Sequence, residues 1–268
     1  MEVSSHGINQ ARINNFKFDI VALTNLGSDH LDYHLNLNNY HNVKLAFINS
    51  SFLAKKKFVP FAYKNKSLKN INYFKVNKKI FKNFNRINFD YDNLYLAYLI
   101  LKSLKYKKKD ILNSLSNIHL HNGRGEIINN NNRKIVIDYA HHIESFESIL
   151  NDNNFNKVVI FGCGGNRDKS KRSKMGEIAS KYAKHVIITK DNSRNENIDG
   201  IINDITTNIK DYLIIKDRKE AIKYALNNYK NMDIYILGKG DETFIEENNT
   251  LIPFNDKDCV LDILNNDN

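Results

Sequence analysis

The chain has 268 residues, of which 41% are hydrophobic, so it can bury the core of one large domain or two modest ones. It contains no apolar run long enough for a membrane span and no secretory signal pattern, and its two cysteines, Cys163 and Cys259, lack metal-ligand spacing and indicate a reduced, cytosolic setting. The net charge of +10 favours anionic partners, but the aromatic residues are not interleaved with the basic ones, so a polyphosphate substrate is favoured over nucleic acid.

The N-terminal part is expected to consist of short strands and helices separated by polar turns. It opens on EVSSH, without a preceding strand or a helix cap, and a strand expected at 18–24 ends in a turn-like N-L-G-S. The sequence DHLDYH follows, in which His30 and His34 lie four residues apart. Further patterns predict helices at 38–48, 90–104 and 109–116 and strands at 57–63 and 72–76. The polar segment IHLHNGRG, residues 118–125, indicates a linker.

Strands and helices alternate regularly after this linker. The pattern predicts strands at 134–139, 158–161, 186–189, 212–216 and 233–237, and helices at 143–150, 173–184, 199–209, 218–228 and 256–264. The asparagine run at 129–132 is interpreted as a loop. Such an alternation is typical of a doubly wound parallel sheet, whose ligands bind beyond the carboxyl ends of the strands.

Candidate ligand-binding residues are most frequent after two neighbouring predicted strands, at 158–161 and 186–189. GCGG follows the first strand directly, so a ligand can approach the backbone there, and Arg167 comes two residues later. The second strand is followed by the sequence DNSR, which ends in Arg194, and guanidinium groups can hold carboxylate or phosphate oxygens. The spacing alone does not distinguish a ligand-binding segment from an ordinary glycine turn with solvated lysines, and it supports the two interpretations about equally. A dinucleotide-binding dehydrogenase is disfavoured, because G-x-G-G is not G-x-G-x-x-G and no acidic residue ends the next strand suitably.

Seven motifs in this order resemble those of the Mur ligase family: EVSSH, TNLGSDHLDYH, GRGE, DYAHH, FGCGGNRDKSKR, DNSR and GKGDE. The resemblance extends from Glu2 to about Leu264. It is closest to the MurE type, which adds the third amino acid to UDP-N-acetylmuramoyl-L-alanyl-D-glutamate. It implies an α/β protein in which residues 1–118 are an incomplete central, ATP-binding domain. Residues 119–268 would form a Rossmann-like, doubly wound C-terminal domain that binds the amino acid.

The activity implied by this resemblance is a cytoplasmic, ATP-dependent amide ligation in peptidoglycan precursor synthesis. The glutamate carboxylate of the substrate would be phosphorylated to an acyl phosphate, which the incoming amine then attacks. Magnesium ions would offset the negative charge of ATP and carboxylate. No nucleic-acid or membrane partner is expected.

The resemblance also implies the residues that carry this chemistry. The catalytic, magnesium-binding residues would be Glu2, His30 and, if carbamylated, Lys44, because a carbamate offers oxygens to a metal that an ammonium would repel. The UDP-muramoyl-dipeptide would contact Ser4, Gln10 and Arg12. ATP would contact Asn93, Arg124, Asp138 and His141. Without the resemblance, these are ordinary solvated charges, a linker arginine and a strand-end Asp/His pair that bonds to the backbone.

The implied amino-acid pocket contains both acidic and basic residues: Arg167, Asp191, Asn192, Arg194, Gly238 and Glu242. The side chain of meso-diaminopimelate ends in a carboxylate and an ammonium, which Arg194 and Glu242 could hold respectively. Lysine-adding relatives lack an arginine at this position, so DNSR favours meso-diaminopimelate. The chain departs from the family at Ser193, Asp241, His142 and Ile143, where proline, histidine, threonine and proline are usual.

The phosphate loop of the family, G-x-x-G-K-T/S, is not found in the chain. The ligase is therefore expected to need a phosphate-loop part, which a separate N-terminal Mur ligase fragment or a longer version of this chain would supply. The alternative is a non-catalytic remnant, or a binding module that retains the nucleotide and amino-acid pockets.

Overall fold

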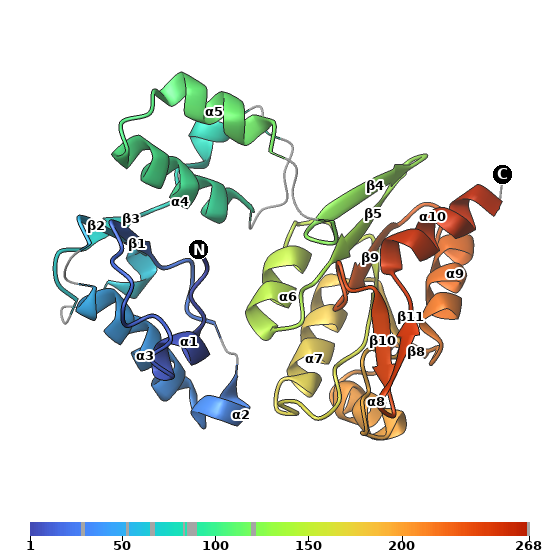
Figure 1. Ribbon diagram of the computed structural model, residues 1–268. Helices are drawn as coiled ribbons and strands as arrows, with labels where there is room; N and C mark the ends of the chain where they lie inside the picture. The colour runs from blue at the N-terminus through green and yellow to red at the C-terminus, as the bar shows by residue number, and fades with distance from the viewer. Residues whose placement is uncertain are drawn as a thin grey trace. The chain divides into compact units, whose positions relative to one another are not determined.

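The chain folds into two compact units, Met1–Ile118 and His119–Asn268 (Figure 1). The computed structural model describes residues 1–27, 30–51, 54–64, 68–82, 84, 90–118 and 122–266. Parts of the expected linker and of the N-L-G-S turn lie outside these ranges. Within them, no helix combines the length and the apolar character that a bilayer crossing requires.

The first unit contains a small parallel sheet in the order β1 (Ile20–Ala22), β2 (Lys56–Pro60), β3 (Asn72–Phe74). Its helices are α1 (Ser5–Asn9), α2 (Leu31–His34), α3 (Leu37–Ser50), α4 (Asp90–Ser103) and α5 (Lys108–Ser116), with short 3-10 turns η1 (Phe61–Tyr63) and η2 (Lys78–Phe81). One core joins the sheet to α3 through Val21, Val59 and Ile48. A second core packs α4 against α5 through Leu94 and Ile111. Burial of these apolar side chains stabilises each core by the hydrophobic effect.

The opening EVSSH does carry a helix cap, so the expectation of an uncapped start was wrong. Ser4 has extended backbone angles, and its Oγ accepts a hydrogen bond of 3.1 Å from the Gly7 amide, which caps α1. A serine in this position satisfies one of the unpaired amides of the first turn. The helix has only five residues, which is too few for its periodicity to be visible in the sequence.

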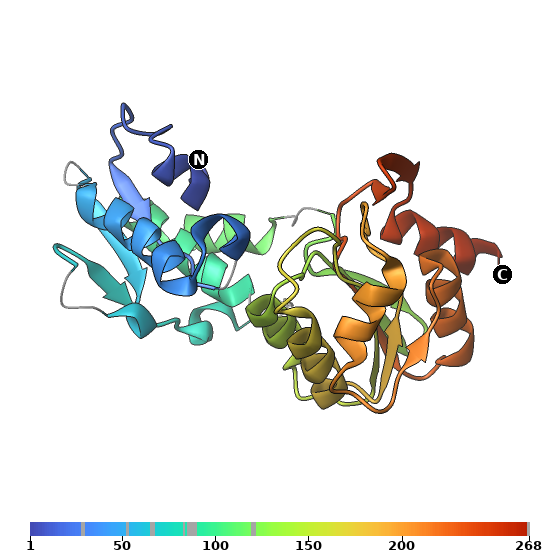
Figure 2. The same ribbon diagram turned by 90° about the horizontal axis from the view of Figure 1, so that it is seen from below.

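The second unit is a six-stranded sheet in the order β4-β5-β9-β6-β7-β8. The strands are β4 (Glu126–Asn130), β5 (Arg133–Asp138), β6 (Lys157–Phe161), β7 (His185–Ile188), β8 (Leu213–Ile214) and β9 (Asp233–Leu237), all parallel except for β4. Helices α6 (Ile143–Leu150), α7 (Arg172–Tyr182) and α8 (Ile198–Thr206) cover one face, and α9 (Arg218–Asn228) and α10 (Asp256–Asn266) cover the other (Figures 1 and 2). This architecture confirms the predicted α/β class.

Two hairpins were missed by the sequence analysis. Asn129 and Asn130 end β4 instead of forming a loop, and Asn131 turns the chain into β5 with a φ of 53°. The second hairpin joins β10 (Phe244–Glu247) to β11 (Thr250–Pro253) through two asparagines with positive φ. Asparagine adopts this left-handed conformation more readily than most residues, so asparagine pairs can form tight hairpin turns.

A buried ion pair joins the first residues of α9 and α10. Arg218 donates two parallel hydrogen bonds, of 2.7 and 2.8 Å, to the carboxylate of Asp256, and both side chains are fully buried. Arg218 also donates to the Leu237 carbonyl at 3.1 Å, at the carboxyl end of β9. The pair therefore connects two helix starts to the end of a central strand.

We predict that Asp256→Ala lowers the free energy of unfolding by about 3–5 kcal/mol, because it leaves the guanidinium buried without a counter-charge. Urea unfolding followed by circular dichroism measures this change. Asp258→Ala, which removes an exposed carboxylate in the same turn of α10, serves as the control and should cost less than about 1 kcal/mol. Equal losses in the two variants would contradict the role given to the buried pair.

Candidate functional site

The first unit contains a cleft that brings together the predicted metal-binding residues. Glu2, His30 and Lys44 all line this cleft, whose volume is about 580 Å³, together with Ser4 and residues of β1. Glu2 precedes α1, His30 precedes α2, and Lys44 lies on the second turn of α3. Three side chains that are distant in sequence therefore share one hollow.

The side chains around the cleft are packed as a group of rings. The Lys44 ammonium lies 4.4 Å from the centroid of the Tyr40 ring, within the range of a cation–π contact. His30 has a φ of 53°, and its ring lies edge-on to His6 with centroids 4.5 Å apart. A non-glycine residue in this left-handed region is uncommon and is found more often at functional sites.

The donors in the cleft are compatible with magnesium bound together with phosphate. Among the described residues, no three or more histidines, cysteines, aspartates or glutamates are grouped so that they could hold a metal by themselves. The cleft offers one carboxylate and one imidazole, from Glu2 and His30. Magnesium is commonly held by one or two carboxylates, while substrate phosphates and water complete its shell, so Glu2 is the group in the cleft that it prefers.

Three other residues predicted for the first unit do not line this cleft. Gln10 and Arg12 lie beyond α1 and are exposed. Asn93 is exposed near the start of α4. Their assignments as ligands of the UDP-muramoyl-dipeptide and of adenine remain predictions.

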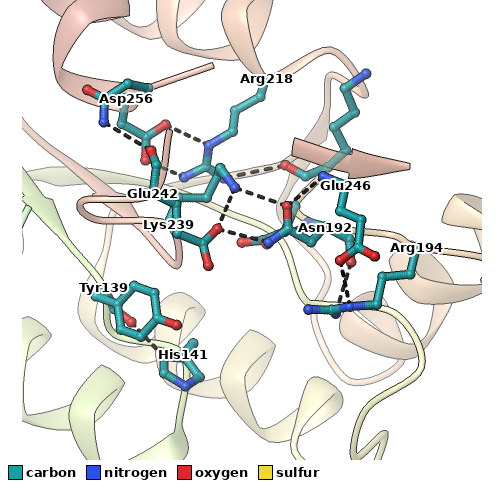
Figure 3. A network of polar contacts seen from close by, with 12 residues as sticks. Tyr139, His141, Asn192, Arg194, Arg218, Lys239, Glu242, Glu246 and Asp256 are labelled. Atoms are coloured by element: carbon teal, nitrogen blue, oxygen red, sulfur yellow. Dashed lines mark hydrogen bonds and ion pairs between the residues drawn. The ribbon is translucent and has the colours of Figure 1, made fainter. Parts of the chain in front are cut away.

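In the second unit, the predicted pocket residues lie in loops at the carboxyl edge of the sheet, and Figure 3 shows three of them, Asn192, Arg194 and Glu242. Asp138 ends β5, the GCGG segment follows β6, the DNSR segment follows β7, and Gly238 follows β9 directly. The strands are parallel and adjacent in the order β5-β9-β6-β7, so their carboxyl ends meet at one edge. Ligands of doubly wound sheets bind at this edge.

A buried lysine links two of the predicted pocket residues. The Lys239 ammonium is fully buried and donates hydrogen bonds of 3.1 Å to Asn192 Oδ1 and 2.6 Å to Glu242 Oε2. Asn192 Nδ2 donates to the same Glu242 oxygen at 2.8 Å. Sequence reasoning missed Lys239, although its place three residues before Glu242 in GKGDE was a visible signal.

Gly238 permits the close approach of the loops that follow β7 and β9. It has a φ of 111°, and a Cβ at this position would lie 2.7 Å from Asp191 Oδ2. Asp191 is buried, and its Oδ1 accepts a hydrogen bond of 2.6 Å from the Asn192 amide. A larger residue at 238 would be strained and would also displace the Asp191 carboxylate.

Arg194 and Arg167 flank the glycine turn. Arg194 donates through Nη1 to the Gly165 carbonyl at 2.9 Å, and its Nε lies 3.1 Å from Glu246 Oε2. Arg167 is exposed, and a Cβ added at Gly164 would lie 3.1 Å from Arg194 Nη1 and 3.8 Å from Arg167 Cγ. Both arginines thus lie beside Gly164, which has no side chain to keep them away from the backbone of the turn.

A second buried arginine, Arg172, holds the glycine turn in place, and its burial was not predicted from the sequence. Arg172 donates to Gly164 O at 3.0 Å and to both carboxylate oxygens of Glu196 at 2.7 and 2.8 Å. The Glu196 carboxylate also accepts the Asn166 amide at 2.9 Å. The hydrogen bonds from Arg172 hold the pKa of Glu196 well below its usual range.

The residues predicted to contact ATP in this unit lie at the end of β5. Asp138 is buried and accepts hydrogen bonds from the Gly125 amide at 2.6 Å and the Ala140 amide at 2.7 Å. The Arg124 guanidinium lies 4.0 Å from the Tyr139 ring centroid and 3.6 Å from Asp241. The Nδ1 atom of His141 lies 2.7 Å from the Tyr139 carbonyl oxygen.

Comparison with known proteins shows to which family the chain belongs. The Mur ligase middle domain matches residues 1–81, and the Mur ligase, glutamate ligase domain matches residues 123–240. The chain is 36% identical over 304 residues to the UDP-N-acetylmuramoyl-L-alanyl-D-glutamate–2,6-diaminopimelate ligase of Rickettsia conorii, covering 97% of this chain and 63% of that protein. The ligase of the same name from Buchnera aphidicola subsp. Baizongia pistaciae is 35% identical over 318 residues, covering 100% of this chain and 63% of that protein.

A solved structure of a UDP-N-acetylmuramoyl-L-alanyl-D-glutamate–2,6-diaminopimelate ligase matches with a TM-score of 0.56 and 25% identity. That match covers 99% of this chain and 64% of the other. The chain therefore belongs to the Mur ligase family, as the seven motifs predicted. It spans about 63% of the length of the curated relatives named above.

We predict that Asp138 titrates near pH 6, because burial raises its pKa to about 6 from an ordinary value of 3.8, despite the two amide hydrogen bonds and the nearby Arg124 charge. The folded state then binds the proton more tightly than the unfolded chain. The contribution of this group to stability is therefore present below pH 3.8 and is lost as the pH rises to about 6. The Asp138 carboxyl carbon signal, followed by NMR against pH and assigned with Asp138→Asn, measures the midpoint. A midpoint near 4 would contradict the prediction.

Proposed function

We propose that this chain forms the metal-, nucleotide- and amino-acid-binding part of an ATP-dependent amide ligase. The reaction joins meso-diaminopimelate to the glutamate carboxylate of UDP-N-acetylmuramoyl-L-alanyl-D-glutamate during peptidoglycan precursor synthesis in the cytoplasm. The glutamate carboxylate is activated as an acyl phosphate, and the amine of diaminopimelate attacks it. The phosphate loop, which these 268 residues do not contain, would come from a further part of the enzyme.

The observation that carries the proposal is the set of charges at the carboxyl edge of the six-stranded sheet. Arg194, Asn192 and Glu242 are buried or partly buried there and are held by hydrogen bonds to one another or to the backbone. A guanidinium and a carboxylate in one pocket match a ligand that bears both a carboxylate and an ammonium. The relatives named above are called ligases of 2,6-diaminopimelate, which supports the same ligand.

In the first unit, Glu2 and His30 would hold magnesium with the phosphates of ATP. Lys44 would become a further oxygen ligand after carbamylation. Bound there, the metal would offset negative charge on ATP and on the glutamate carboxylate. Ser4, Gln10 and Arg12 are proposed to hold the UDP-muramoyl-dipeptide, and Asn93, Arg124, Asp138 and His141 to hold the nucleotide.

The second candidate function is a binding module that does not catalyse ligation. One observation favours it: the residues proposed for the amino-acid pocket all lie within the second unit, in the loops after β6, β7 and β9. Such a pocket can bind an amino acid without the residues of the first unit. Binding of diaminopimelate is common to both functions, and only the ligase also forms the tripeptide product.

We predict that the chain binds meso-diaminopimelate more tightly than L-lysine, and that Arg194→Ala removes this preference. The variant should weaken diaminopimelate binding by about 10- to 100-fold, because a charge-assisted pair to the distal carboxylate is lost. Lysine has no distal carboxylate, so its affinity should change by less than about threefold. Isothermal titration calorimetry measures both dissociation constants.

Lys174→Ala is the matched control for this experiment, since it removes one cation that pairs with Glu177 on α7. It should leave both affinities unchanged. A wild-type chain without a preference for diaminopimelate, or an Arg194→Ala variant that loses both ligands equally, would refute the pocket assignment.

A further inference from the structure

The loop between α4 and α5 combines exposed apolar and basic side chains, and it does not line the cleft of the first unit (Figure 1). Leu104 and Tyr106 are 53% and 60% exposed. Exposed lysines lie on the loop and on the adjoining helix ends: Lys102, Lys105, Lys107, Lys108 and Lys109. Among the residues that the structure describes, none of these five ammonium groups is in an ion pair. Two apolar side chains are thus flanked by positive charge that no acidic side chain balances.

The end of α4 holds this loop in a defined backbone conformation. The Tyr106 amide donates to the Leu101 carbonyl at 3.3 Å, and the Lys105 amide donates to the Lys102 carbonyl at 3.0 Å. These two bonds form the Schellman pattern, in which the left-handed residue is usually glycine. Here it is Lys105, with a φ of 69°. Leu101 packs against the α4–α5 core, whereas Leu104 and Tyr106 remain at the surface.

The excess positive charge of the chain belongs to the first unit, which contains this loop. Met1–Ile118 has 19 of the 40 lysines and arginines but only 7 of the 30 aspartates and glutamates, which is a formal net charge of +12. His119–Asn268 has 21 and 23 respectively, which is a net charge of −2. An anionic partner is therefore attracted to the first unit.

A surface of anionic lipids matches both features of the loop. Leucine can enter the boundary between head groups and acyl chains, and tyrosine is enriched there because its ring is apolar and its hydroxyl is polar. Lysines beside it are attracted to anionic head groups, and their long stems keep the charge in water. Nucleic acid matches only the charge, because a single-strand binder stacks successive bases on several aromatic rings and the loop has one.

We propose that residues 104–107, with the lysines beside them, bind peripherally to membranes that contain anionic lipids. Leu104 and Tyr106 enter the head-group region, and the lysines contact the anionic head groups. Apolar insertion or charge alone gives weak, reversible binding, whereas the two together give more stable attachment. Such a contact needs no spanning helix, and it differs from the sequence-based expectation of no membrane partner.

The chain contains no tryptophan, so Tyr106→Trp introduces a single fluorophore into the loop. When the full chain with this substitution is mixed with vesicles of phosphatidylcholine and phosphatidylglycerol, its emission should shift to the blue, because the ring leaves water. Vesicles of phosphatidylcholine alone should bind at least about tenfold more weakly, because the lysines then lack a counter-charge. Tyr212→Trp, at an exposed tyrosine of the second unit, is the control and should show no shift.

A pair of double variants tests the charge. Lys105→Gln/Lys107→Gln removes the lysines on either side of Tyr106 and should weaken binding to the anionic vesicles by about 10- to 30-fold, since each lysine near the surface contributes about fivefold. Lys64→Gln/Lys75→Gln removes the same charge from the same unit, where both ammonium groups lie over one exposed phenylalanine ring. This control should weaken binding by less than about threefold, because salt screens charges that are distant from the contact. Flotation of the vesicles measures the bound fraction.

Equal losses in the two double variants, or no blue shift for Tyr106→Trp, would overturn the proposal. Tighter binding to a single-stranded oligonucleotide than to the anionic vesicles would assign the loop to nucleic acid and overturn it as well. A blue shift that grows with protein concentration without vesicles would assign the loop to contact between copies of the chain, with the same consequence. None of these outcomes affects the proposed function, which is tested by the binding of diaminopimelate.

Discussion

The proposed amino-acid site is organised around one buried ammonium group, that of Lys239. Lys239 lies in the loop after β9, and its hydrogen bonds to Asn192 and Glu242 tie that loop to the loop after β7. Burying a lysine ammonium costs free energy unless the charge is paired, so loss of either partner of Lys239 would destabilise the fold. Arg218 acts similarly at the carboxyl end of β9, where it donates to the Leu237 carbonyl and to Asp256. The hydrogen bonds of these two buried cations join the loops after β7 and β9 and the first turns of α9 and α10.

Each of the two units supplies a different part of the proposed chemistry. The first holds Glu2, His30 and Lys44 around one cleft, where phosphate and metal are expected. The second holds paired opposite charges at the proposed amino-acid site, where Arg194 lies beside Glu246. The donors of the cleft suit a magnesium ion that is shared with phosphate, and the charges of the pocket suit an amino acid with a second zwitterionic end. Both sets are built from residues within their own unit.

The sequence predicted the long elements and the family, but not the side chains that stabilise the pocket. Helices α6 and α9 and strand β9 have the predicted bounds, because their apolar periodicity is strong and polar turns flank them. The β10–β11 hairpin was missed because its turn is Asn248-Asn249 and its strand ends in two glutamates, which resemble a solvated loop. The burial of Lys239 and Arg172 was not predicted because lysine and arginine are usually exposed, and only tertiary contacts reveal it. Three residues that were identified from the family motifs, Glu2, His30 and Lys44, line one cleft in the structure. Gln10 and Arg12, identified in the same way, do not line it.

A crystal structure of the chain with meso-diaminopimelate tests the central claim most directly, namely that the pocket is formed in advance by the buried Lys239. We expect the hydrogen bonds of Lys239 to Asn192 and Glu242 to be unchanged in the complex. The distal carboxylate of the ligand should lie against the Arg194 guanidinium. A ligand bound away from Arg194, or a complex in which Lys239 has left both partners, would contradict the account.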